Sequence, residues 1–116
     1  MINLAGIDHV VLRVTDLETS MRFYEQVLGA RLEKAQEAIG LYQLRAGSSL
    51  IDLVPVDGPL GRQGGAPPGA EGRNVDHVCF RVMPWDGEAI LAHLRRHGIE
   101  YGAGPRSEVQ GCPGQS

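Results

Sequence analysis

Polar and apolar residues alternate near the N-terminus as they do in a strand that is buried on one side. Over residues 7–14 the apolar and β-branched residues predict a strand. Because side chains alternate across a strand, His9 and Arg13 share one face. The opposite face carries the apolar side chains Val10, Leu12 and Val14. We expect the apolar face to pack on a helix and the histidine face to look into a ligand-accessible concavity.

A helical pattern follows this strand, and three further strands follow the helix. Apolar residues at spacings of four, three and four predict one face of an amphipathic helix, formed by Leu17, Met21, Tyr24 and Leu28. Thr15 and Glu18 have the spacing of a capping box at its start, and Gly29 ends it. Strands are predicted at about 30–37, 41–46 and 49–55. The first half is therefore predicted to be β-α-β-β-β.

The second half of the chain repeats the beginning of the first. Residues 75–82 contain the same Asp-His-Val and Arg-Val positions as residues 7–14, in register. A helix capped by Asp86 and a short strand at about 99–101 are predicted next. The pattern then stops, so two strands of the second module are missing. We expect the native polypeptide to continue past Ser116 with the missing strands.

Glycine and proline divide the chain between these halves. The sequence has 16 glycines, and residues 58–73 hold six of them with three prolines. Such a segment is neither a helix nor a central strand. We therefore expect one α+β domain over residues 1–116. It consists of a first module at 5–57, a linker at 58–73 and a second, incomplete module at 74–116.

Composition excludes several classes of function. The chain has 116 residues, 22% of them charged, and a net charge of −3, without a basic cluster beyond Arg95-Arg96. A nucleic-acid ligand is therefore not expected. No apolar run approaches the roughly 20 residues of a membrane span, and the N-terminus lacks the pattern of a secretory signal. A cytoplasmic location is the expectation.

His9 and His77 are the strongest candidates for chemistry. They occupy equivalent positions in the two repeats. A pseudo-twofold axis between the modules would bring equivalent positions together, and two convergent imidazoles are the nucleus of a divalent-metal site. We expect their ring nitrogens to lie within roughly 5 Å of each other, because a Zn–N bond is about 2.0–2.1 Å. The alternative is a pair of hydrogen-bonded histidines preserved by the duplication.

Asp52 is the second candidate, because it interrupts an apolar strand. A buried carboxylate is costly unless it is paired or bound to a metal. It could be a third metal ligand, a general base, or a partner of Arg13 or Arg81. The alternative is an acid on the wetter face of a half-exposed sheet.

Two further features are weaker. His93 and His97 stand four residues apart on the second predicted helix, without the intervening glutamate of a zinc protease motif. We expect them on a solvated helix face. Cys79 shares the predicted histidine face, although a small buried thiol is the more common role for such a residue.

These residues together resemble the vicinal oxygen chelate superfamily, which includes glyoxalase I, fosfomycin-resistance enzymes, extradiol dioxygenases and bleomycin-resistance proteins. The resemblance covers about residues 5–101. Its motifs are Gly6-Ile7-Asp8-His9-Val10-Val11-Leu12, Thr15-Asp16-Leu17, Phe23-Tyr24, Leu28-Gly29 and Asn74-Val75-Asp76-His77-Val78. It implies paired βαβββ modules that form a cupped, mixed sheet around a metal. Carried over by position, the ligands are His9, His77 and Asp52. The glutamate that usually completes the set is missing from this chain, so the resemblance implies that a strand beyond Ser116 carries it. The alternative is a truncated protein that holds a metal weakly, through these three residues alone. Asp52 is also shorter than the residue common at its position.

The resemblance implies a metal-dependent lyase or isomerase of the glyoxalase I-like kind. A divalent ion (Zn, Ni, Mn or Fe) would be chelated by two oxygens of a small substrate, with Asp52 as ligand or base. A non-catalytic binding protein of the bleomycin-resistance kind and a metal-dependent dioxygenase are the alternatives. The expected partners are the substrate and a second copy of the chain in a homodimer.

Overall fold

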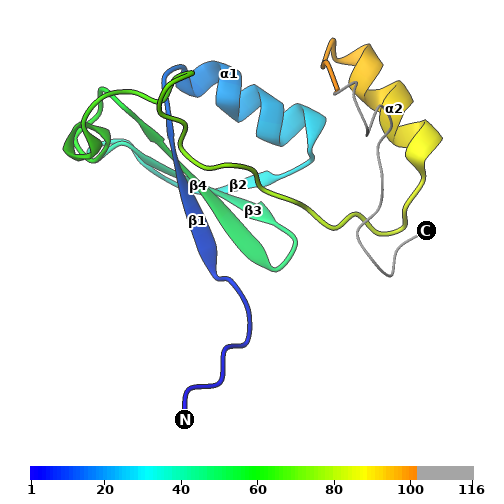
Figure 1. Ribbon diagram of the computed structural model, residues 1–116, viewed down its shortest axis with the longest axis horizontal. Coiled ribbons are helices and arrows are strands. Elements are labelled where there is room, and N and C mark those ends of the chain that lie inside the picture. The colour runs from blue at the N-terminus through cyan, green and yellow to red at the C-terminus, as the bar shows by residue number, and fades with distance from the viewer. Residues whose placement is uncertain (102–116) are drawn as a thin grey trace. The chain divides into compact units, whose positions relative to one another are not determined.

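The computed structural model describes residues 1–101 and divides the chain into two units, Met1–Asp76 and His77–Ser116. The first unit contains an open sheet of four strands with one helix across it (Figure 1). Its elements are β1 (His9–Val14), α1 (Leu17–Arg22), a π-helical turn (Phe23–Val27), β2 (Arg31–Gln36), β3 (Leu41–Ala46), β4 (Ser49–Pro55) and a short 3₁₀ helix (Gly61–Gly64). The β-α-β-β-β order predicted for the first half is present.

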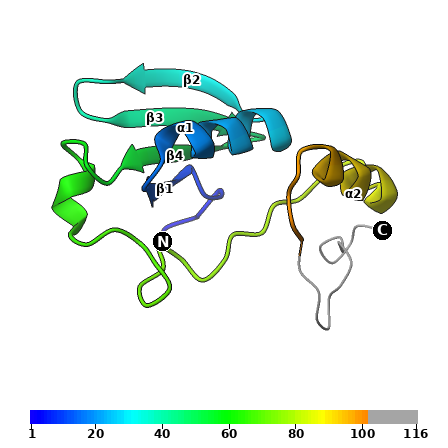
Figure 2. The ribbon, with the colours of Figure 1, turned by 90° about the horizontal axis from the view of Figure 1, so that it is seen from above.

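The sheet has the strand order β1-β4-β3-β2, and its strands lie side by side with α1 across one face (Figure 2). β1 runs parallel to β4, whereas β3 is antiparallel to both of its neighbours. The parallel pair needs a long connection, and α1, β2 and β3 supply it. Tight turns at Gly40 and Gly47, both with positive φ, join the antiparallel strands.

The core lies between the sheet and α1. Leu44 and Leu53 are fully buried at the centre of the sheet. The cluster around them comprises Leu12, Ala30 and Ile51, with Val10, Val14, Leu17, Met21 and Tyr24 packed against it. This confirms that the apolar face of the first strand packs on the helix.

The C-terminal end of the helix differs from the prediction. The apolar spacing predicts Leu28 on the buried face, but Leu28 is 43% exposed, and Val27 is buried instead. The cause is the π-helical turn at Phe23–Val27, which takes more residues per turn than an α-helix and so shifts the face that meets the sheet.

Asp16 caps the N-terminus of α1, whereas Thr15 was expected to do so. The Asp16 side chain accepts a hydrogen bond from the Thr19 backbone N–H at 3.1 Å and another from the Thr19 hydroxyl at 2.8 Å. These bonds, the backbone bond first, hold the pKa of Asp16 below its usual value.

Replacing Asp16 with alanine is expected to lower the melting temperature at neutral pH. Because the pKa is lower in the folded state, the ionised carboxylate stabilises the fold above the ordinary carboxyl range. That contribution is lost as the pH falls through the lowered pKa. Thermal melts of Asp16→Ala and wild type should therefore converge toward acid pH. Asp16→Asn, which caps without a charge, is the matched control; a gap that does not depend on pH would contradict the assignment.

The second unit contains α2 (Gly87–Arg96). Asp86 caps it as predicted, with its carboxylate accepting from the Ala89 N–H at 3.1 Å. The predicted strands at 75–82 and 99–101 are not present. A strand needs a neighbour to pair its backbone groups, and residues 77–101 contain no strand that could serve as one. Any strand within 102–116 lies outside the described residues.

The tandem arrangement of two βαβββ modules, the second of them incomplete, therefore stays a prediction, and so does the homodimer. Among residues 1–101 no helix is long and apolar enough to cross a membrane.

Candidate functional site

The candidate site lies on the face of the sheet opposite α1. The strand register places Val11 of β1 next to Asp52 of β4, and Asp52 next to Gln43 of β3. Paired residues on neighbouring strands project to the same side. His9 and Arg13, which the alternation in the sequence placed on one face, therefore share this face with Asp52. We call this the open face.

Asp52 is buried, with 3% of its surface exposed. The Gln43 side-chain amide reaches its two carboxylate oxygens at 3.3 and 3.5 Å, both long for a charge-assisted hydrogen bond. The interpretation of Asp52 as an acid on a wet surface is therefore wrong. Among the described residues this amide is the one side-chain donor to Asp52, so the carboxylate retains lone pairs for a further ligand.

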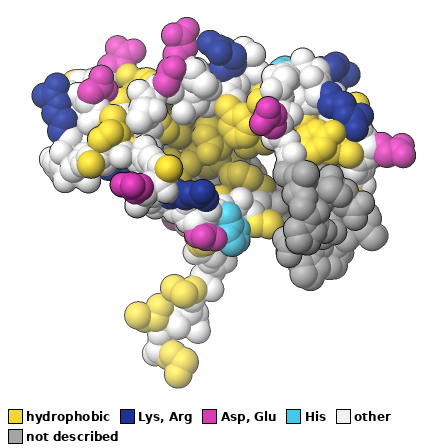
Figure 3. Space-filling model, turned by 45° about the horizontal axis from the view of Figure 1, so that its top comes forward, with side chains coloured by type: hydrophobic (Ala, Val, Ile, Leu, Met, Phe, Trp, Pro, Cys, Tyr) yellow, Lys and Arg dark blue, Asp and Glu magenta, His cyan; other side chains and the backbone are white. Residues whose placement is uncertain are grey.

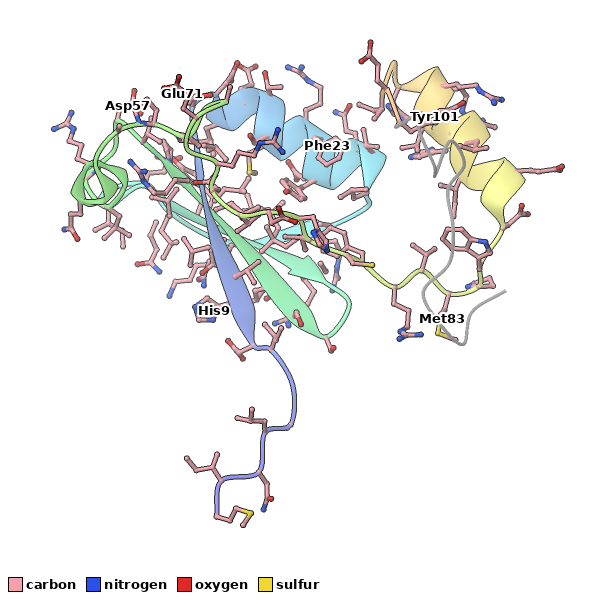
Figure 4. The ribbon with its side chains drawn as sticks, viewed as in Figure 1. His9, Phe23, Asp57, Glu71, Met83 and Tyr101 are labelled. Atoms are coloured by element: carbon pink, nitrogen blue, oxygen red, sulfur yellow. The ribbon has the colours of Figure 1, made fainter. Side chains whose placement is uncertain are left out.

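His9 projects from the start of β1, next to the N-terminal segment, and its side chain is 47% exposed (Figure 4). Its Nδ1 lies 2.9 Å from Oδ2 of Asp8. That hydrogen bond, followed by attraction to the charge of Asp52, raises the pKa of His9. A carboxylate on Nδ1 fixes the ring and leaves Nε2 available, which is the usual arrangement of a metal-binding histidine.

Arg13 bonds to the backbone of the linker rather than to Asp52. Its Nη2 donates to the Gly65 carbonyl at 2.7 Å and to the Gly61 carbonyl at 2.9 Å. Nε also donates to Gly61 at 3.2 Å, and Nη1 donates to the Ala66 carbonyl at 3.0 Å. Within residues 1–101 no ion pair joins Arg13 to Asp52. Asp52 is therefore not the ion-pair partner of Arg13.

His77 belongs to the second unit, so its convergence with His9 stays a prediction. In the same unit His93 in the last turn of α2 and His97 at its C-cap lie beside each other, with ring centroids 4.6 Å apart. No group of three or more His, Cys, Asp or Glu side chains that could hold a metal occurs within residues 1–101. The open face of the first unit therefore contributes two metal-type donors, from His9 and Asp52.

These two donors fit a divalent transition metal in kind. Imidazole nitrogen and carboxylate oxygen are common ligands of such ions, and a site with few protein ligands keeps positions for substrate. The buried, incompletely satisfied carboxylate is the structural observation that supports this fit.

Two partners of the site were not among the predicted residues. Asp8 orients His9 through a hydrogen bond to its ring. The sequence holds a signal for this role, because an aspartate also precedes the second histidine of the repeat, as Asp76 before His77. Gln43 faces Asp52 across the hairpin of β3 and β4. The tight turn at Gly47 fixes this register, but which polar residue it places opposite Asp52 depends on the exact hairpin length.

The first unit thus has a β-α-β-β-β module with a histidine and a buried carboxylate on the face opposite its helix, which is the architecture of a glyoxalase-type fold. The chain belongs to the Glyoxalase/Bleomycin resistance protein/Dioxygenase superfamily, whose family model matches residues 6–112. The resemblance inferred from the sequence motifs is confirmed.

Solved structures with this fold support the assignment. A virulence protein of Salmonella typhimurium is 27% identical, with a TM-score of 0.68 over 90% of this chain and 77% of that one. The fosfomycin resistance protein FosX of Listeria monocytogenes, solved with Mn(II) and sulfate, is 15% identical, with a TM-score of 0.64 over 90% and 74%. Lactoylglutathione lyase of Agrobacterium tumefaciens is 17% identical, with a TM-score of 0.60 over 84% and 73%. The last two similarities concern the fold alone.

Proposed function

We propose that this protein is a divalent-metal-dependent lyase or isomerase of the glyoxalase I-like kind, acting on a small substrate with two adjacent oxygens. The observation that carries the proposal is the placement of His9 and Asp52 on one face of neighbouring strands, with the charge of Asp52 acting on His9. His77 is proposed as the third ligand. The proposal includes a homodimer located in the cytoplasm.

Each residue of the first unit has a distinct part in this proposal. His9 would bind through Nε2, with Asp8 holding its ring in the required orientation. Asp52 would bind or accept a proton from the substrate, and Gln43 would keep its carboxylate in place. A divalent ion bound there would act as a Lewis acid that stabilises negative charge on the substrate oxygens.

A non-catalytic binding protein is the second candidate. It is favoured by one observation: within residues 1–101 no three metal-type side chains form a group. A binder of this kind would use the open face without needing a complete set of ligands.

Metal analysis of the purified protein, followed by three assays on the metal-loaded form, would separate these functions. We expect close to one divalent ion per chain and metal-dependent binding of acetohydroxamate, a small chelator with two adjacent oxygens. Lyase or isomerase turnover of α-hydroxycarbonyl compounds without oxygen uptake would support the first proposal. Oxygen consumption would identify a dioxygenase, whereas ligand binding by the metal-free protein would favour the binder.

A further inference from the structure

We propose that the glycine-rich segment 61–66 holds the Arg13 side chain so that its charge is kept away from Asp52. The proposal depends on the role suggested above for Asp52. Segment 61–66 belongs to the stretch 58–73 that the sequence predicts to be a linker between the two modules.

Arg13 stands close enough to Asp52 to compete for it. In the register of β1 and β4, Val11 pairs with Asp52 and Arg13 pairs with Val54, on the same face. Two positions along a strand span about 6.6 Å, and an extended arginine side chain covers such a distance. An ion pair between the two would neutralise the carboxylate and compete with a metal for its lone pairs.

The 61–66 segment prevents this pairing by satisfying the guanidinium with uncharged groups. Four hydrogen bonds of 2.7–3.2 Å connect Arg13 to three backbone carbonyls. The planar fork of an arginine can donate in several directions at once, which a lysine cannot reproduce. The positive charge of Arg13 therefore remains on the open face without forming an ion pair with the Asp52 carboxylate. The residues accepting these bonds are Gly61, Gly65 and Ala66.

Glycine is required where this segment meets the sheet. A Cβ on Gly61 would lie 1.8 Å from the carbonyl oxygen of Pro55, and a Cβ on Gly64 would lie 2.3 Å from Nε of Arg13. The first contact is with rigid backbone, and the second is with a side chain that can move. An alanine at Gly64 would therefore push Arg13 off the segment while leaving its charge in place.

This geometry allows a double-mutant test with Mn(II) as the probe. In Gly64→Ala the displaced guanidinium is free to pair with Asp52. We therefore expect Mn(II) affinity to fall by about tenfold, which is the usual effect of losing a residue that supports a metal ligand. In Arg13→Met no cation remains, so affinity should be equal to that of wild type or higher. The double variant Arg13→Met/Gly64→Ala should therefore recover wild-type affinity. Gly69→Ala is the matched control, because a Cβ there meets no atom within 4 Å.

Isothermal titration with Mn(II) measures these affinities. Wild-type affinity in Gly64→Ala, or a double variant as weak as that single variant, would overturn the proposal. Loss of affinity in Gly69→Ala would also overturn it, because the effect would then not depend on Arg13.

Amide hydrogen exchange tests the fastening without any metal. The Arg62 N–H bonds to the Gly58 carbonyl and the Gln63 N–H to the Leu60 carbonyl, so both amides report on the segment. We expect both to exchange at least about tenfold faster in Arg13→Met and in Arg13→Lys. Unchanged exchange would overturn the role of Arg13. If wild type binds no Mn(II) while exchange accelerates as expected, the proposed metal function fails and the fastening of the segment stands.

Discussion

Truncation of Leu53 to alanine is expected to destabilise the protein by about 2–5 kcal/mol, the range for buried leucines. Leu53 is fully buried in β4, between Leu12 of β1 and Tyr42 of β3. Both neighbouring strands are hydrogen-bonded to β4, so the backbone around the side chain cannot collapse easily into the space left behind. The cost is therefore lost burial together with a residual cavity.

Urea denaturation followed by circular dichroism measures this change. Leu32→Ala in β2 is the matched control, because Leu32 is 41% exposed and the same atoms are removed. The control should lose less than about 1 kcal/mol, as is usual for substitutions away from the core. Equal losses for the two variants would contradict the placement of the core beneath α1.

Replacement of Asp52 with asparagine is expected to lower divalent-metal affinity by at least about tenfold, while leaving the stability of the metal-free protein unchanged or higher. The carboxylate is buried, and its one side-chain hydrogen-bond partner among residues 1–101, the Gln43 amide, lies at 3.3–3.5 Å. Burying a charge with so little compensation costs free energy. A neutral isostere removes that cost together with the negative charge that a cation requires.

Calorimetric titration with Mn(II) or Zn(II), with a urea melt of the metal-free protein, measures both effects. Asp57→Asn is the control, because Asp57 is an exposed carboxylate in the loop after β4 (Figure 4). An Asp52→Asn variant that binds metal as tightly as wild type would remove Asp52 from the proposed ligands. A large loss of stability would show instead that its carboxylate holds the sheet together.

The first module could be predicted because its signals are local. Alternation over residues 7–14 distinguished the two faces of β1, and glycines at positions 29, 40 and 47 marked turns that the structure makes with positive φ. The placement of His9 and Asp52 on one face follows from the same alternation together with the β1–β4 register.

Other features depend on interactions that a local pattern does not carry. The π-helical turn that exposes Leu28 inserts extra backbone into a helix whose apolar spacing looks regular. The contact between Arg13 and segment 61–66 joins residues about fifty positions apart, through backbone carbonyls that every sequence possesses. Residues 75–82 have the composition of a strand, but a strand forms only where a neighbour pairs with it.

The segment before β1, residues 1–8, carries several apolar side chains that are largely exposed. Met1, Ile2, Leu4 and Ile7 are each at least two-thirds exposed. Figure 3 shows this N-terminal segment with its hydrophobic side chains uncovered. The polar face of β1 begins immediately after it, at His9, so the open face is bordered by apolar surface on this side.

The most direct test of the central claim is a Mn(II) titration of wild type, His9→Ala and His77→Ala, followed by the electron paramagnetic resonance signal of free Mn(II). The claim is that the two repeated histidines bind one metal together with Asp52. It predicts that wild type binds close to one ion per chain and that each alanine variant binds at least about tenfold more weakly. His97→Ala, at the C-cap of α2, should bind as wild type does. A His77→Ala variant with the full metal content and affinity of wild type would contradict the claim.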